Sequence, residues 1–351
     1  GEPVRHQGGQ VSSAAPHGGD VDHLASAEWL GRGARWLALL GALLGIGVLA
    51  FAAGSLTGSI PEVRAAAFWV RRAGLAVAFG SVVEICAAGS LLHGDWGMGL
   101  APSGIWSALD GSFGLAALFR MAGGIAMLFG AQLAVSPLLN AGTHQIPDRM
   151  PAGIHGSLAV DTRVRAATHR LNVGQSKIAL AGAGLVALSY LFDGHTVTAE
   201  PSWLVRTANV AHVVGAGVWV GGVSMMTWVL RRRHRQKVEL RAAELAVRFS
   251  TVAAAALIVV ALAGSALSFA ILDSPGELLS TEFGRLLLLK IAAVVAAAAV
   301  GGYNHLFVIP ELVRSPADGY ASERLRETVR IEAWILVGVV GLTAVLVGAA
   351  T

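Results

Sequence analysis

The sequence predicts an all-α polytopic membrane protein, a bundle of eight transmembrane helices with both termini on the extracytoplasmic side. Composition is the first observation: 54% of the 351 residues are hydrophobic and only 14% are charged, whereas about a quarter of a typical soluble domain is charged. The second is a series of eight apolar stretches, each close to the ~20 residues that a helix needs to cross a bilayer. They cover residues 36–56, 70–92, 113–135, 176–192, 204–230, 249–272, 284–308 and 331–350.

The chain divides into three parts. Residues 1–34 are rich in Gly, Ser, Ala and His, and they predict a flexible extracytoplasmic linker. Residues 35–192 form an N-terminal four-helix half, in which the fourth stretch is the shortest, and residues 193–351 form a C-terminal four-helix half. Gly217 and Gly221 are spaced four apart, as in helices that pack closely in membranes.

The loop charges predict the orientation of the helices, because Lys and Arg near the ends of spans favour the cytoplasmic side. The loop after the fifth stretch holds seven basic residues, and those after the first, third and seventh hold three, five and four. The loops after the second, fourth and sixth stretches hold none, and they carry Asp95, Asp110, Asp193, Glu200, Asp273, Glu277 and Glu282. This alternation predicts extracytoplasmic termini. Contacts with lipid headgroups, rather than with nucleic acid, then explain the excess of basic residues in the chain.

Four ionisable residues from four stretches fall in one layer, the outer third of the membrane. At 1.5 Å per residue, His212 lies ~10 Å below the outer edge, Glu84 ~12 Å, Lys290 ~10 Å and Arg120 ~8 Å. The long side chains of Lys290 and Arg120 can reach the headgroups, whereas His212 and Glu84 cannot, so we interpret these two as the functional candidates. The alternative is that Glu84 pairs with one of the basic residues and that His212 binds a backbone carbonyl.

Two further groups of polar residues mark the ends of a candidate pathway. Arg206, Asn209 and His212 repeat at i, i+3 and i+6, which predicts a polar stripe that lines an entry path. A second set near the inner face is a candidate gate or release site: Gln132, Asn304, His305 and Glu332. The alternative for this set is a helix cap, or an ion pair between Glu332 and Arg330.

Copper is the metal that best fits the available ligands, because thioether and imidazole suit Cu(I) while imidazole and carboxylate suit Cu(II). The outer loop after the second stretch places His93, Asp95 and Met98 within six residues, and the loop "FDGHT" adds His195. The pair Met225 and Met226 lies ~20 Å beyond His212, so it cannot share a metal with it, and we interpret it as packing.

Other chemistries have weaker support. The chain contains no phosphate loop, HExxH motif or dinucleotide fingerprint, so we expect no enzyme. Its one cysteine, Cys86, excludes an internal disulfide and a multi-cysteine zinc site. A membrane haem or redox protein is the main alternative, with His212 as axial ligand and His93, His195 or His305 as the second histidine.

Five stretches of the second half carry a resemblance to a known family. They are "ANVAHVVGAGVWVGGV" (208–223), "RFSTVAAAALIVVALAGSALS" (248–268), "FGRLLLLKIAAVV" (283–295), "YNHLFVIPEL" (303–312) and "LRETVRIEAWILVGVVGLTAVLV" (325–347). Together they resemble the copper resistance D (CopD) family of bacterial inner-membrane proteins. The most specific element is the spacing His-x6-Trp-x-Gly-Gly at His212, Trp219, Gly221 and Gly222.

The resemblance implies copper handling at the bacterial cytoplasmic membrane, with import of copper received from an extracytoplasmic carrier. By residue it supports His212, Asn304 and Glu332, and it places Trp219 on the pathway. Residues 1–4, "GEPV", resemble the segment that follows a copper-binding CopC domain in fused members, which implies a CopC-like carrier fused upstream. A copper receptor or storage protein that does not transport is a further alternative.

Overall fold

The computed structural model describes residues 18–143, 176–193, 201–237, 241–272, 274–315 and 319–349. Within these ranges the regular elements are helices and no strand occurs, which confirms the all-α prediction. The elements are α1 (Gly18–Gly54), α2 (Ile60–His93), α3 (Trp96–Leu100), α4 (Pro102–Ala108), α5 (Gly111–Thr143), α6 (Lys177–Ser189), α7 (Ser202–Arg235), α8 (Ala242–Ile271), α9 (Glu277–Ser280), α10 (Glu282–Tyr303), the π-helical turn η2 (Asn304–Val308), α11 (Ile309–Arg314) and α12 (Gly319–Ala349).

Six of the described segments are long and apolar enough to cross a membrane, and they make this a multi-pass membrane protein. They are Leu24–Gly54, Ile60–His93, Gly111–Ala134, Ser202–Arg235, Ala242–Ile271 and Glu282–Arg314. The other two predicted spans coincide with α6, an apolar helix of 13 residues, and with α12, a helix of 31 residues. Eight membrane crossings therefore stay a prediction, as does the side on which the termini lie.

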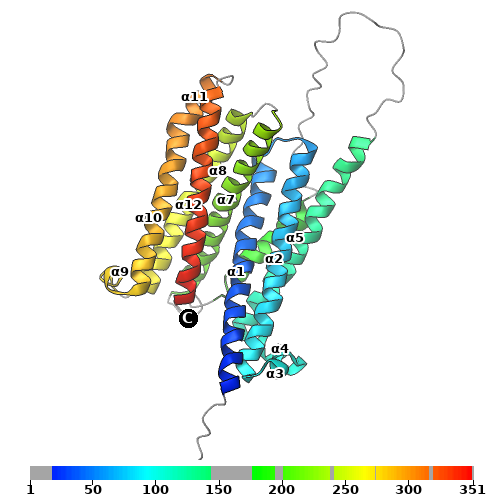
Figure 1. The fold of residues 1–351 in the computed structure, drawn as a ribbon, viewed down its shortest axis with the longest axis vertical. Helices are drawn as coiled ribbons and strands as arrows, with labels where there is room; N and C mark the ends of the chain where they lie inside the picture. The colour runs from blue at the N-terminus through cyan, green and yellow to red at the C-terminus, as the bar shows by residue number, and fades with distance from the viewer. Residues whose placement is uncertain are drawn as a thin grey trace, which may run out of the picture.

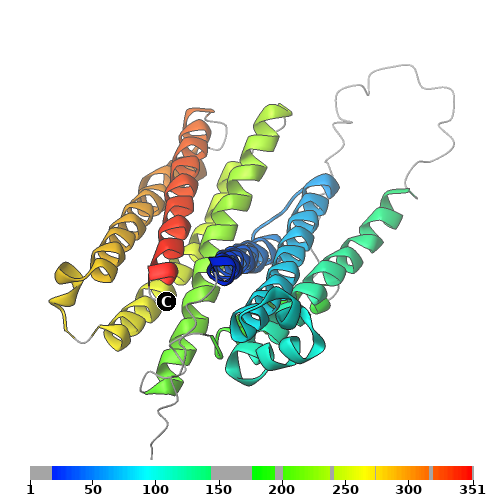
Figure 2. The same ribbon diagram turned by 60° about the horizontal axis from the view of Figure 1, so that its bottom comes forward.

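The helices pack in an order that separates two groups. Helix α1 packs against α2 on one side and α7 on the other. In one group α2 packs against α5, which packs against α6. In the other group α7 packs against α8 and α12, and α10 packs against α12. Figures 1 and 2 show α1 between these two groups. Figure 1 also places α3, α4, α9 and the C-terminus at one end of the bundle and α11 at the opposite end. The short helices α3, α4 and α9, which lie within two of the acidic loops, thus share one end of the bundle.

A crossing of α1 and α7 joins the two groups through backbone contact. A Cβ atom added at Gly47 would lie 2.0 Å from the carbonyl oxygen of Gly217 and 2.6 Å from the Cα of Gly221, so no side chain fits there. The expectation that Gly217 and Gly221 permit close helix packing is confirmed. In its most apolar window α7 is 67% buried, against 17% for α8 and 11% for α10. Helix α7 is therefore the central element of the C-terminal group.

The faces of α8 and α10 that point away from α7 and α12 expose large apolar side chains. Phe269 is 82% exposed, Leu262 69% and Val295 61%. In water such a surface would be an interaction or aggregation site. On helices of this length and hydropathy it is the surface that lipid chains cover.

A buried ion pair ties α2 to the far end of α7. The Arg233 Nε donates to Glu62 Oε1 at 2.8 Å, its Nη2 donates to Glu62 Oε2 at 3.1 Å, and the same Nη2 donates to the carbonyl of Thr57 at 3.0 Å. Both charged side chains are nearly inaccessible. Such a two-pronged pair has a fixed geometry, so it sets the position of α7 against the turn between α1 and α2. The sequence did not predict this pair.

Candidate functional site

One face of α7 carries three side chains with metal-binding or hydrogen-bonding atoms. His212, Trp219 and Met226 follow one another at intervals of seven residues. Seven residues are almost two full turns, so the three side chains share one face and are separated by steps of ~10 Å along the helix. Because this face points toward α8, α10 and α12, it lines the interior of the C-terminal group.

His212 is the one nearest the Ser202 end of α7. Its Nδ1 lies 3.3 Å from the carbonyl oxygen of Val260 on α8, and Lys290 on α10 lies near enough for its charge to act on the ring. Gly264 makes room for the ring, because a Cβ atom there would lie 3.1 Å from the His212 Cε1. A proton on Nδ1 completes a hydrogen bond to Val260 and leaves Nε2 as the free ligand atom.

Trp219 and Glu332 form the second level. The indole Nε1 donates to Glu332 Oε1 at 2.8 Å, and the two residues are 4% and 5% exposed. Among the described residues no lysine or arginine forms an ion pair with Glu332. The carboxylate is therefore held by a neutral donor. The expected alternative of an ion pair with Arg330 is not what the structure has.

Glu332 lies well inside α12, because that helix begins at Gly319. Its partner Trp219 stands near the middle of α7, which begins at Ser202 and ends at Arg235. The expectation that Glu332 lies near the inner face stays a prediction, whereas the start of α12 at Gly319, well before the apolar stretch that starts at residue 331, was not predicted. The first turns of α12 are rich in charged residues, so they do not register as part of a span.

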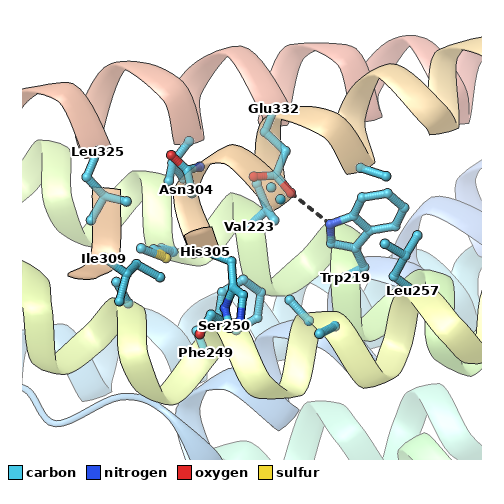
Figure 3. Close-up of a pocket in the computed structure, with 18 residues that line it drawn as sticks. Trp219, Val223, Phe249, Ser250, Leu257, Asn304, His305, Ile309, Leu325 and Glu332 are labelled. Atoms are coloured by element: carbon cyan, nitrogen blue, oxygen red, sulfur yellow. Dashed lines mark hydrogen bonds between the residues drawn. The ribbon is translucent and has the colours of Figure 1, made fainter. Parts of the chain in front are cut away.

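Glu332 and Trp219 open onto a cavity of about 160 Å³ between α7, α8, the α10–α11 segment and α12 (Figure 3). Asn304, His305 and Met226 also line it, together with apolar side chains from α8 such as Phe249. This volume accommodates a metal ion with bound water.

The turn η2 interrupts the helix at the inner part of this cavity. It begins at Asn304, whose Oδ1 accepts a hydrogen bond from Thr328 Oγ1 at 2.5 Å. Single π turns inside helices occur frequently at functional sites. The structure thus brings Asn304, His305 and Glu332 to one cavity, whereas Gln132 lies on α5, which contributes nothing to the lining.

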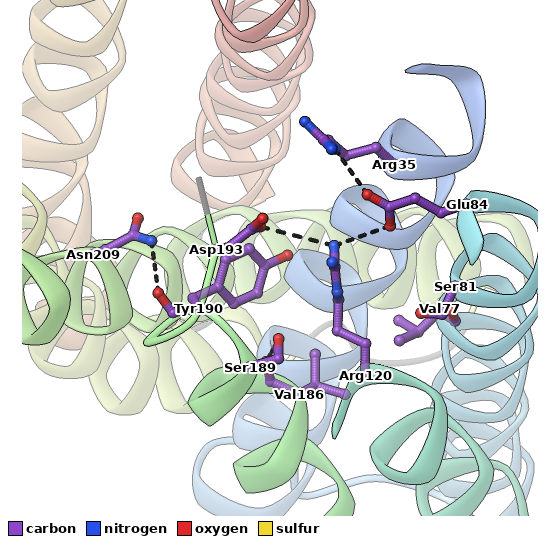
Figure 4. Close-up of polar contacts among 10 residues, drawn as sticks. All are labelled: Arg35, Val77, Ser81, Glu84, Arg120, Val186, Ser189, Tyr190, Asp193 and Asn209. Atoms are coloured by element: carbon purple, nitrogen blue, oxygen red, sulfur yellow. Dashed lines mark hydrogen bonds and ion pairs between the residues drawn. The ribbon is translucent and has the colours of Figure 1, made fainter. Parts of the chain in front are cut away.

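The four residues of the predicted outer layer lie in two places, Glu84 with Arg120 in one helix group and His212 with Lys290 in the other. Glu84 receives Arg35 Nε on its Oε1 at 2.9 Å, and its Oε2 lies 3.3 Å from Arg120 Nη1 (Figure 4). Arg120 Nη1 also lies 3.8 Å from Asp193. Glu84 and Arg120 are 3% and 1% exposed. Glu84 thus pairs with basic residues, which was the alternative for it, and α1 lies between α2, which carries Glu84, and α7, which carries His212.

The polar stripe on α7 contacts two different neighbours. Asn209 Nδ2 donates to the carbonyl of Tyr190 at 2.9 Å, just after the end of α6 (Figure 4). His212 instead contacts α8. Asn209 therefore anchors α7 to the α6 turn. Arg206 lies one turn further out on the same helix. An entry path along these residues stays a prediction.

The outer-loop ligand candidates are exposed. His93 is the last residue of α2, and Met98 is 55% exposed on α3. Asp95 Oδ2 accepts the Met98 backbone N–H at 2.8 Å and so caps α3. His195 lies outside the described residues. Within those that are described, no three His, Cys, Asp or Glu side chains lie close enough together to hold a metal ion.

Met225 and Met226 are both buried, at 2% and 3% exposure, in the hydrophobic core. This agrees with the expectation that the pair packs. Met226 has an additional position that the sequence reasoning missed, because it also lines the cavity. The seven-residue interval from His212 through Trp219 to Met226 is the signal that would have identified it.

Comparison with known proteins points to copper. Residues 243–346 match the family model described as copper resistance protein D. The match covers α8 to α12 and includes Asn304, His305 and Glu332. A stretch of 119 residues is 29% identical to "Copper transport protein CutJ" of Bacillus subtilis (strain 168), covering 34% of this chain and 22% of that relative. The stretch thus spans about a fifth of the relative's length. No solved structure matches.

Proposed function

We propose that this protein, whose segment from α8 to α12 belongs to the copper resistance D family, carries copper across the cytoplasmic membrane through its C-terminal helix group. Its membership in a copper-related family and its multiple apolar helices support a membrane protein that handles copper. The observation that carries the proposal further is the Glu332 carboxylate, which is buried at mid-helix depth with a neutral indole as its partner.

A buried carboxylate without a cationic partner is costly. On insertion scales a charged side chain in the middle of a membrane costs about 2.5–3.5 kcal/mol, and an arginine partner would offset part of that cost. Among the described residues Glu332 has one N–H donor, Trp219, and it faces a cavity large enough for an ion. A passing copper ion supplies the missing positive charge. Glu332 is then the residue that receives the cargo, and Trp219 orients its carboxylate.

The other polar residues of α7 extend this site into a column. His212 lies ~10 Å outward of Trp219, and Met226 lies ~10 Å inward of it. Asn304 and His305 adjoin the inner level. In this column His212 is the outer station, Glu332 the middle station, and the group beyond it the inner one.

The direction that fits the column is import. The loops at the outer end carry Asp95, Asp110 and Glu277, which attract cations, and a CopC-like carrier outside the membrane is the proposed donor. The chain carries no nucleotide-binding motif, so we propose a transporter that is not an enzyme. The copper gradient or exchange between ligands drives the movement.

The test is copper entry into liposomes that contain the purified chain and an enclosed copper-sensitive dye. The wild-type protein is expected to raise the rate of entry above that of empty liposomes, and Glu332→Gln is expected to lower it at least tenfold. Met225→Leu is the control, because Met225 packs in the core and does not line the cavity.

Equal rates for wild type and Glu332→Gln contradict the site. If wild type admits no copper but binds it, the receptor or storage alternative replaces transport. A stoichiometric Soret band in the purified protein would favour the haem alternative.

A further inference from the structure

The inner end of the cavity combines a sulfur and an imidazole. Met225 and Met226 are neighbours with nearly equal burial, but only Met226 is among the residues that line the cavity. His305 lines the same cavity from the π turn η2. The thioether of Met226 on α7 and the imidazole of His305 on η2 therefore line the same cavity.

Contacts with α12 place these two residues at one level. Thr227, which follows Met226, directs its Oγ1 toward the Val329 carbonyl at 3.4 Å. Asn304, which precedes His305, accepts from Thr328. Positions 328 and 329 are adjacent on α12 and lie about one turn, ~5 Å, from Glu332. Met226 and His305 are thus at the same height, one turn inward of Glu332.

The π turn directs His305 toward α8. In Figure 3 the His305 side chain points to Phe249 and Ser250, away from the Glu332 side of the cavity. His305 and Ser250 also line a second, more open hollow, together with Thr251 and Arg314 near the end of α11. His305 therefore stands between the cavity and the more open hollow toward the inner end of the bundle.

We propose that the Met226 thioether and the His305 imidazole bind the cargo as Cu(I), forming an inner station from which the ion leaves through the hollow beside Ser250. Thioether sulfur suits Cu(I), whereas a carboxylate such as Glu332 does not favour this oxidation state. This inference rests on the proposed function, and it adds the oxidation state and the exit of the cargo.

The experiment measures Cu(I) binding by the full chain in detergent under reducing, oxygen-free conditions, with a coloured Cu(I) chelator as competitor. All variants carry Cys86→Ser, so that the single thiol does not compete. Met226→Leu and His305→Ala are each expected to weaken the binding of one Cu(I) ion per chain at least tenfold. Met225→Leu is the matched control and is expected to bind as the parent does, because Leu and Met are close in volume.

Unchanged Cu(I) affinity in Met226→Leu overturns the inference. An equal loss in Met225→Leu also overturns it, because that result assigns the effect to packing. The proposed transport function can fail separately. If Met226→Leu selectively weakens Cu(I) binding but the wild-type chain admits no copper into liposomes, the Cu(I) site stands and the permease function is contradicted.

Discussion

The two helix groups treat their buried glutamates differently. In the first group, Glu62 receives Arg233 through two hydrogen bonds, and Glu84 lies between Arg35 and Arg120. In the second group, Glu332 is equally buried, but its one hydrogen-bond donor in the described part of the chain is the Trp219 indole. The paired glutamates face no described cavity, whereas Glu332 opens onto one. Burial alone therefore does not separate a structural carboxylate from a functional one.

The distinction lies in what neutralises the charge. A carboxylate with a buried arginine is already satisfied, and removal of either partner leaves an uncompensated charge. A carboxylate with a neutral donor keeps capacity for a cation. We propose that the first kind contributes to stability and the second to cargo binding. The following predictions test this distinction, from the largest effect on stability to the smallest.

Arg233→Ala is expected to have the largest effect. It leaves the Glu62 carboxylate buried without its partner and removes the link to the Thr57 carbonyl, so the free energy of unfolding should fall by about 3–5 kcal/mol. Chemical unfolding in detergent measures this loss. Arg231→Ala, at an exposed position two residues away, is the control and should stay within about 0.5 kcal/mol. Equal effects from the two variants would show that the buried pair is not what stabilises this end.

Glu84→Gln is expected to cost less, about 2 kcal/mol, because Arg120 keeps Asp193 nearby and Arg35 reaches solvent. The double variant Glu84→Gln with Arg120→Gln should lose less than the sum of the two single losses, since it removes both charges. Unfolding of the four proteins in parallel gives the coupling energy. Strictly additive losses would mean that the 3.3 Å contact does not stabilise the outer layer.

Asn209→Ala removes a single neutral hydrogen bond, from the side-chain amide to the Tyr190 carbonyl. The expected loss is about 1 kcal/mol, measured by the same unfolding assay. If Asn209 also lines the entry path, copper entry falls as well. Thr207→Ala serves as the comparison, since Thr207 is on the same turn and bonds only within its own helix. A larger stability loss in Thr207→Ala than in Asn209→Ala would contradict the anchoring role.

Hydropathy was sufficient to predict the helical membrane fold, because six of the eight apolar stretches correspond to long apolar helices. Depth counting placed Glu84, Arg120, His212 and Lys290 in one layer, and the structure brings Glu84 within 3.3 Å of Arg120. It could not assign partners within the layer, since equal depth does not tell which helices are neighbours. The insertion of α1 between α2 and α7 decides that, and it depends on the tight contact at Gly47.

Other features escaped prediction for local reasons. Glu62 and Arg233 stand at the ends of apolar runs and therefore resemble interfacial charges, although the fold buries both. The full length of α12 was not predicted because its first turns are rich in charged residues. The π turn at Asn304 leaves no mark in the hydropathy pattern. Met226, by contrast, was predictable from its spacing along α7.

The most direct test of the central claim measures stability and copper entry together for Glu332→Gln and Glu84→Gln. Glutamine keeps an acceptor for Trp219 and removes the charge, so Glu332→Gln should unfold within about 1 kcal/mol of wild type. Its rate of copper entry should nevertheless fall at least tenfold. Glu84→Gln should show the reverse, a loss of stability with copper entry retained in the folded fraction. Normal entry in Glu332→Gln would contradict the account.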